Sequence, residues 1–245
     1  MKEHWIILGA SSSIARAFVR EVAHRGATLT LVGRDADDMS ATAADAKLRG
    51  AAGTRTLLCD ATDAVSRTTF LTQANLPDTA LNVFLAIGSM PDQDAMDGDP
   101  ALLANMIAST YTGPVALLQG LVPFFESQRS GRIVVVGSVA GDRGRRKNYL
   151  YGSAKAGLAR YAEGLRARLY PSGVAVTLIK PGFVDTSMTW GMPGLFLVAS
   201  PESCATTILK AADRGAATVY VPFFWRYIML IIQHIPSQIM KKLHF

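Results

Sequence analysis

The sequence has few of the residues from which disulfide-bonded or metal-bound proteins are built. Its two cysteines, Cys59 and Cys204, stand far apart and among apolar residues, and its four histidines have no spacing that suits a metal ion. We therefore expect reduced thiols in a packed core, with no disulfide and no bound metal.

Charge is also sparse, since 18% of the 245 residues are charged and 49% are hydrophobic. Low-complexity linkers, internal repeats and breaks in composition are absent, which favours one large α/β domain over residues 1–222. Only four residues precede "WIILGA", which lacks a small-residue cleavage site, so we expect no signal peptide and a cytoplasmic protein.

The net charge of +6 suggests an anionic partner, but the basic residues are scattered along the chain. The exception is the cluster of Arg143, Arg145, Arg146 and Lys147. A cluster of this size is typical of a solvated loop, and we expect no nucleic-acid partner.

Short apolar runs alternate with longer segments of helical period, a pattern typical of βα units around a parallel sheet. The strands are expected at residues 5–10, 27–33, 54–60, 80–88, 131–138, 174–180 and 217–222. The helices are expected near 13–25, 36–49, 62–74, 101–128, 149–170 and 201–213. The fold class is therefore α/β, a doubly wound, seven-stranded parallel sheet with helices on both faces and a ligand site beyond the carboxyl ends of its strands.

A nucleotide loop is predicted where the first strand meets the first helix, at Gly9-Ala10-Ser11-Ser12-Ser13-Ile14-Ala15. Free backbone N–H groups and the positive end of the helix would attract a pyrophosphate there, with Ser13 as a cap. Only one glycine is present, and an ordinary strand-to-helix turn with serine caps is the alternative.

The ends of the next strands favour a dinucleotide. Arg34 follows the second strand and could pair with a 2'-phosphate, which favours NADP(H), whereas the adjacent Asp35 keeps NAD(H) possible. Asp60 could accept from the adenine amino group, and Gly88 would let the backbone approach the adenosine ribose.

A reactive centre is predicted from three residues. Tyr151 and Lys155 lie four residues apart at the start of a helix, and Ser138 ends the fifth strand thirteen residues earlier. The lysine would lower the pKa of the tyrosine, which could then exchange a proton with an alcohol or ketone while the serine binds the same oxygen.

Together with the nucleotide loop, these motifs resemble the short-chain dehydrogenase/reductase family, which has a Rossmann fold, from residue 5 to about 222. The resemblance implies Tyr151 as general acid/base, Lys155 as its partner at the nicotinamide ribose, and Ser138 as the group that orients the carbonyl. It also implies a homo-oligomer and an apolar substrate lid at 189–200. The implied cofactor contacts are Gly9, Ser11, Ser12, Ser13, Ile14, Arg34, Asp60, Ala61, Ala86, Gly88, Tyr151, Lys155, Pro181, Gly182, Val184 and Thr186.

One departure from the family pattern affects the proton relay. Where the family has Asn-x-x-Gly, this chain has Thr110-Tyr-Thr-Gly113. Thr110 keeps a hydroxyl without the reach of an amide, so we expect it to be a relay member that slows turnover. Asn105 is not an obvious substitute, since five residues along a helix rotate a side chain by roughly 140°.

The chain ends in an apolar and basic tail at 223–245, which Pro236 divides into two expected helices. A helix over "FFWRYIMLIIQHI" would be roughly 20 Å long, too short to span a bilayer. It either packs on the domain or a partner subunit, or anchors the protein at a membrane surface with Trp225 and Tyr227 at headgroup level. The second alternative is favoured because the segment is apolar nearly all round.

The tail, "GASSSIA" and "SVAGDRGRRKNYLYGSAKAG" also resemble a subset of the family, the reductases of the 2-keto sugar of decaprenylphosphoryl pentose. That resemblance implies a lipid-linked carbonyl substrate and a place at the inner face of the membrane. A soluble carbonyl or 3-oxoacyl reductase with a structural tail, and a nucleotide-binding protein without catalysis, are the alternatives.

Overall fold

A seven-stranded parallel sheet forms the centre of the molecule. The computed structural model describes residues 3–74, 76, 81–191 and 194–243. The strands run in the order β3-β2-β1-β4-β5-β6-β7, so the chain winds outward from β1 in both directions. They are β1 (His4–Leu8), β2 (Thr28–Gly33), β3 (Gly53–Leu58), β4 (Leu81–Leu85), β5 (Arg132–Val136), β6 (Ala175–Pro181) and β7 (Thr218–Val221).

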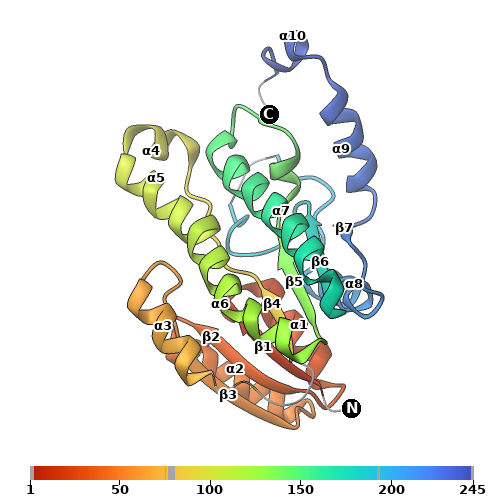
Figure 1. The fold of residues 1–245 in the computed structure, drawn as a ribbon. Coiled ribbons are helices and arrows are strands. Elements are labelled where there is room, and N and C mark those ends of the chain that lie inside the picture. Colours follow the sequence, from red (N-terminus) through yellow and green to blue (C-terminus); the bar gives the residue numbers. More distant parts are fainter. Residues whose placement is uncertain (1–2, 75, 77–80, 192–193, 244–245) are drawn as a thin grey trace.

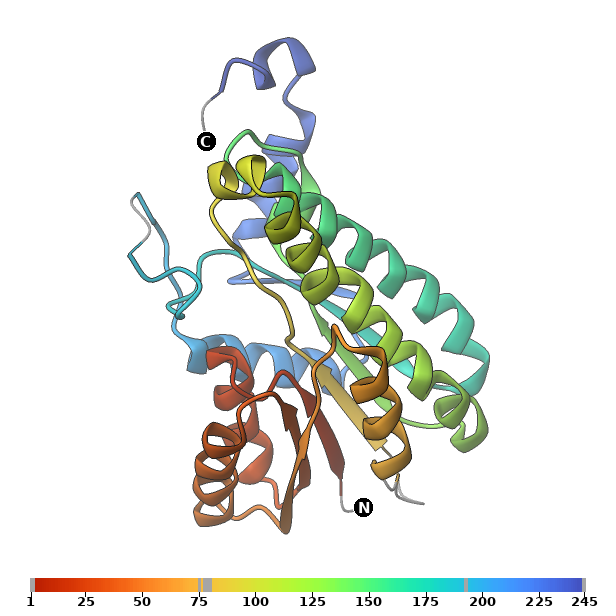
Figure 2. The same cartoon turned by 90° about the vertical axis from the view of Figure 1, so that its left-hand side faces the viewer.

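Helices cover both faces of the sheet because successive strand residues point to opposite sides. In β1, Trp5 and Ile7 pack under α1 (Ser13–Ala23), α2 (Ala36–Leu48) and α8 (Pro201–Asp213), with Phe18 of α1 stacked on Phe84 of β4. Ile6 and Leu8 face α3 (Ala64–Gln73), α6 (Gly113–Gln128) and α7 (Tyr149–Leu169). Figure 2 shows the two helical layers with the sheet between them, which confirms the doubly wound fold.

The helix expected over 101–128 is a composite of α5 (Pro100–Ile107), a π-helical turn η1 (Ala108–Thr112) and α6. A short helix, α4 (Gln93–Gly98), precedes it and was not predicted. Two 3₁₀ turns, η2 (Val139–Asp142) and η3 (Tyr170–Ser172), flank α7. Among the described residues, Pro100–Gln128 is the single helical run long and apolar enough to cross a membrane by length and composition. The buried leucines of its α6 part pack on the sheet, and 33% of its most apolar window is buried.

The tail forms two helices, α9 (Trp225–His234) and α10 (Ser237–Met240), at the end of the molecule where α4 lies (Figure 1). One face of α9 packs on the domain, with Trp225 2% exposed and Met229 fully buried. Trp225 is therefore not at headgroup level, contrary to expectation, because it lies inside the molecule. Tyr227, Leu230 and Ile231 remain exposed on the outer face.

The basic cluster at 143–147 is less solvated than expected. The Arg143 guanidinium donates to the carbonyl of Ile235 at 3.0 Å, which connects the loop to the tail. The Arg145 side chain is partly buried, and burial lowers its pKa. Both cysteines are free and buried, as expected.

Candidate active site

A cavity of about 630 Å³ runs along the carboxyl ends of the strands. Its walls come from the segments after β1 to β6 and from the first turns of α7, so it follows the edge where a doubly wound sheet binds ligands. Every predicted site residue except Thr110 lies on these walls. They are Gly9, Ser11, Ser12, Ser13, Ile14, Arg34, Asp60, Ala61, Ala86, Gly88, Ser138, Tyr151, Lys155, Pro181, Gly182, Val184 and Thr186.

The turn between β1 and α1 forms one end of the cavity. Gly9 has φ +86°, and a Cβ there would lie 2.8 Å from the carbonyl oxygen of Ala86, so only glycine fits. The cap residue of α1 is Ser12 and not Ser13 as expected, and its side chain makes no capping hydrogen bond. The amide groups of the first turn thus face the cavity without a side-chain acceptor from the cap, an arrangement suited to a phosphate group.

The residues after β2 and β3 give this end of the cavity its charges. Arg34 is exposed on the wall, and its charge contributes to a lowered pKa of Asp60. The larger cause is Thr62, whose amide and hydroxyl both donate to the Asp60 carboxylate, at 2.8 and 2.7 Å. The Asp35 carboxylate caps α2 instead of binding a ribose diol, since it accepts a hydrogen bond from the Asp38 amide.

Ser138, Tyr151 and Lys155 meet on the wall formed by β5 and α7. The Ser138 hydroxyl accepts from the Ala140 amide at 3.0 Å and so caps η2, which turns the chain from β5 toward α7. Tyr151 and Lys155 are 6% and 5% exposed. The Lys155 ammonium donates to the carbonyl of Val136 at 3.0 Å and lies 5.8 Å from the centre of the Tyr151 ring.

Burial controls the ionisation of this pair. It raises the pKa of the Tyr151 phenol to about 12, and a side-chain hydrogen bond with Ser138 acts in the opposite direction. It lowers the pKa of the Lys155 ammonium from 10.5 to about 8. The expected lowering of the tyrosine pKa by the lysine is not seen, because desolvation of the phenol outweighs an ammonium that is 5.8 Å away and already hydrogen-bonded.

Thr110 lies behind the wall. It is fully buried in the π-helical turn, where its hydroxyl accepts from the Ser89 amide and donates to the Ser89 carbonyl, both at 3.0 Å. A Cβ on Gly88 would lie 3.4 Å from Lys155 Nζ and 3.6 Å from Thr110 Oγ1, so both side chains face this glycine. The hydroxyl is thus hydrogen-bonded to the segment that follows β4.

Several wall residues were not predicted from the sequence. Asn105 lines the same cavity as Tyr151, whereas Thr110 does not, so the two side chains differ in direction as the helical rotation predicts. The five residues between them include part of the π-helical turn η1. Leu102 and Met106 share an apolar cluster with Tyr151 and line the cavity, and Met188 lines it as well. Isolated apolar residues of this kind carry no sequence signal.

The segment expected to form a lid begins beside the cavity, where residues 186–189 line the wall. A β-bridge between Val184 and Ala199 joins the two ends of this segment, and the Ala199 amide donates to the Phe183 carbonyl at 3.0 Å. Trp190 is largely exposed. The expected lid at 189–200 includes residues 192–193, which lie outside the described residues.

These features fit a dinucleotide. The cavity offers an uncapped helix N-terminus at one end, a glycine that leaves room for close approach, and a buried phenol and ammonium at the other. Among the described residues, no group of three or more histidine, cysteine or acidic side chains could hold a metal ion.

Comparisons with known proteins agree with this geometry. Residues 3–193 match the family model described as short chain dehydrogenase. An uncharacterized oxidoreductase of Mycobacterium tuberculosis is 32% identical over 239 residues, which is 97% of this chain and 96% of that protein.

Two solved structures share the fold over 97% of this chain. A short-chain dehydrogenase from Sphingobium yanoikuyae in complex with NADPH has a TM-score of 0.80 at 22% identity and is covered to 97%. The bulky-bulky ketone specific alcohol dehydrogenase from Comamonas testosteroni has a TM-score of 0.81 at 20% identity and is covered to 96%. The chain belongs to the short-chain dehydrogenase family and is an NAD(P)-dependent oxidoreductase.

Proposed function

We propose that the protein reduces a carbonyl group with NADPH and that Tyr151 supplies the proton. The observation that carries the proposal is the meeting of Ser138, Tyr151 and Lys155 at one end of a cavity whose other end is the uncapped N-terminus of α1. When bound, the nicotinamide supplies the hydride that reduces the carbonyl carbon. Residues 1–222 are proposed as the catalytic domain, with 223–245 as its tail.

Each residue of the centre has a role that follows from its ionisation and contacts. Tyr151 stays protonated near neutral pH because its pKa is about 12, and it donates that proton to the carbonyl oxygen as negative charge develops there. Ser138 binds the same oxygen and stabilises the charge. Lys155 supplies a positive charge beside the phenol and can bind the nicotinamide ribose, while Thr110 holds the end of β4 against them.

The proposed preference is for NADPH over NADH. Arg34 is exposed on the cavity wall, whereas the carboxylate that could bind a ribose diol, Asp35, caps α2. Pro181, Gly182, Val184 and Thr186 are the proposed contacts for the nicotinamide, and Gly9 to Ile14 for the pyrophosphate. Asp60, Ala61, Ala86 and Gly88 are the proposed contacts for adenosine.

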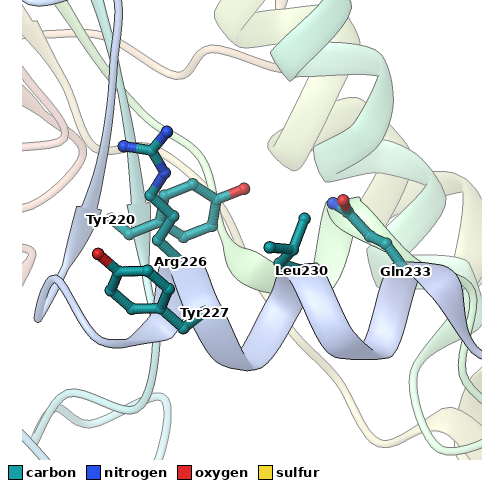
Figure 3. A pocket seen from close by; sticks show the side chains of 5 residues that line it. All are labelled: Tyr220, Arg226, Tyr227, Leu230 and Gln233. Carbon is teal, nitrogen blue, oxygen red and sulfur yellow. The ribbon is translucent and has the colours of Figure 1, made fainter.

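The proposed substrate is a carbonyl compound with an apolar body, because Leu102 and Met106, which cluster with Tyr151, line the cavity. A keto-sugar linked to a polyprenyl phosphate is the specific candidate, with the protein located in the cytoplasm, at the inner membrane face, and assembled as a homo-oligomer. A hollow where α9 meets β7 supports this candidate. It has a volume of about 360 Å³ and is lined by Tyr220, Arg226, Tyr227, Leu230 and Gln233. Figure 3 shows Leu230 and Gln233 rising from α9 on the side of Tyr220.

The test is the oxidation of NADPH and of NADH, followed at equal concentrations with a panel of keto compounds that do or do not carry a lipid chain. We expect turnover with NADPH, faster with the lipid-bearing compounds, and a loss of at least about 10³-fold for Tyr151→Phe, which removes the proton donor. A Tyr151→Phe variant that still binds NADPH but keeps its turnover would contradict the proposal.

A further inference from the structure

The C-terminal helix α9 lies directly behind the wall of the cavity. A Cβ on Gly182 would lie 1.9 Å from Nε1 and 2.1 Å from Cε2 of Trp225, so the indole occupies the space that any larger residue at 182 would need. Gly182 lines the cavity, and Trp225 is 2% exposed. The indole therefore sets the position of this part of the wall from the outside.

The same indole contacts the segment between β6 and α8. Its ring centre lies 5.4 Å from that of Phe183 and 5.6 Å from that of Phe196, and these two phenylalanines are 5.7 Å apart. Phe183 precedes and Phe196 lies within the 184–199 segment, whose residues 186–189 line the cavity. Three mutually packed rings thus join the tail to both ends of that segment.

Trp225 also shares a buried cluster with Val139, the residue after Ser138. The cluster around Trp225 therefore adjoins the segment after β5 as well as the segment after β6.

We propose that Trp225 is a positioning residue, which fixes the 181–183 wall and the segment after it for the nicotinamide end of NADPH, so that α9 is part of the active site. The inference rests on the proposed function, since it needs NADPH in the cavity. It differs from a merely structural role of the tail because it concerns one contact, between Trp225 and Gly182, and not the stability of α9.

The contact can be tested by enlarging residue 182 and by removing the side chain of Trp225, separately and together. Gly182→Ala adds a methyl group that points at the indole, and Trp225→Ala removes the indole. We expect Gly182→Ala to raise the Kd for NADPH by about tenfold and Trp225→Ala by about fivefold, whereas the double variant should bind like Trp225→Ala alone, because neighbours in contact are not additive. Binding is measured by the fluorescence of the reduced nicotinamide, a signal that remains when Trp225 is replaced.

A conservative variant and a matched control complete the design. Indole Nε1 of Trp225 is buried, with no hydrogen-bond partner in the described structure, so Trp225→Phe loses no hydrogen bond and should keep the Kd within about threefold. Met229→Ala removes a fully buried side chain from the same helix and cluster, whereas the three atoms nearest to a Cβ at Gly182 all belong to Trp225. It should lower the unfolding temperature and leave the Kd unchanged.

The inference is overturned by a double variant in which the two losses multiply. It is also overturned by a Met229→Ala variant that weakens NADPH binding as much as Trp225→Ala does. If Trp225→Ala does not fold, Gly182→Ala and Trp225→Phe still decide the question, because their Kd values should differ by about threefold or more. If the unmodified chain binds no NADPH, the proposed function fails, whereas normal binding by every variant refutes the positioning role alone.

Discussion

At the scale of single residues, burial of the charged Lys155 side chain lowers the stability of the folded state. The ammonium is 5% exposed, and one hydrogen bond to the carbonyl of Val136 accompanies it into the interior. Its pKa of about 8 shows that the folded state disfavours the charged form. A buried charge with so little compensation is typical of a functional position.

We predict that Lys155→Met stabilises the protein at pH 7 while it abolishes turnover. Lowering the pKa of Lys155 from 10.5 to about 8 costs the folded state on the order of 3 kcal/mol. Methionine has a similar volume, and the lost hydrogen bond offsets about 1 kcal/mol. The unfolding free energy, measured by urea titration, should therefore rise by roughly 2 kcal/mol.

The advantage of Lys155→Met should depend on pH in a defined direction. Below pH 8 the lysine is protonated in the folded and unfolded states, and its full cost is present. As the pH rises toward 10.5 the folded state no longer binds the proton, so this cost disappears and the advantage of Lys155→Met is lost. Lys47→Met, an exposed change on α2, should show no such trend, and an equal trend in both variants would contradict the prediction.

Arg34 is the residue on which the choice of cofactor should depend. We predict that Arg34→Gln raises the Kd for NADPH by about tenfold or more, since a hydrogen bond between charged groups contributes about 1.5–3 kcal/mol. The Kd for NADH should stay within about twofold, because Asp35 caps α2 in both proteins.

Arg160→Gln is the matched control, because it removes the same charge from an exposed arginine that pairs with Glu163 on α7, away from the cavity. Both Kd values are measured by nicotinamide fluorescence at one ionic strength. Equal losses for NADPH and NADH in Arg34→Gln would mean that the guanidinium does not recognise a 2'-phosphate.

At the scale of elements, the contact between η2 and α7 holds Ser138 beside Tyr151. A Cβ on Gly141 would lie 2.8 Å from the backbone of Lys155 and Ala156, so the two elements touch at their backbones. Asp142, at the end of η2, accepts a hydrogen bond from Tyr220 at 2.7 Å and pairs with Lys180 at 2.5 Å, which ties the turn to β6 and β7.

We predict that Gly141→Ala lowers kcat by about tenfold or more, because the methyl group must push η2 from α7 and so separate the serine from the phenol. Circular dichroism and the NADPH Kd show whether the fold is retained. Gly144→Ala is the control in the same loop, where a Cβ would meet nothing within 4 Å. A Gly141→Ala variant as active as Gly144→Ala would show that the close contact does not position the centre.

The elements themselves were largely predictable, and the exceptions have physical causes. The strands lie within two or three residues of their expected limits, because period and turn residues act locally. The π-helical turn at Thr110 depends on tertiary contacts with Ser89, which no local pattern reveals. The burial of Trp225 depends likewise on Gly182 and Phe183, more than forty residues earlier in the chain, whereas the apolar tail alone favoured membrane contact over packing.

At the scale of the whole molecule, the tail presents two different faces. The inner face of α9 belongs to the domain, whereas Tyr227, Leu230 and Ile231 remain exposed on the outer face. Arg226 lies on α9 among them, and Lys241 and Lys242 follow α10. Exposed apolar side chains accompanied by basic ones suit the surface of an anionic membrane, which is the contact proposed for this tail.

We predict that the protein floats with vesicles that contain phosphatidylglycerol, and floats less with neutral vesicles or at high salt. Leu230→Ser with Ile231→Ser should lower the bound fraction severalfold, because each apolar side chain contributes about 1–3 kcal/mol on burial. Leu48→Ser with Val65→Ser removes side chains that are more exposed than Leu230 and Ile231 from α2 and α3, at the end of the molecule away from α9 (Figure 1), and should change nothing.

Sedimentation of the same two double variants distinguishes membrane binding by the tail from association with a second copy of the chain. If the Leu230 and Ile231 changes convert an oligomer into a monomer and vesicle binding is absent throughout, the outer face of α9 is an interface between subunits. NADPH binding should survive in either case, because Leu230 and Ile231 lie outside the cavity and Trp225, on the inner face, remains in place. Loss of flotation together with loss of NADPH binding would instead mean that the two faces of α9 do not act separately.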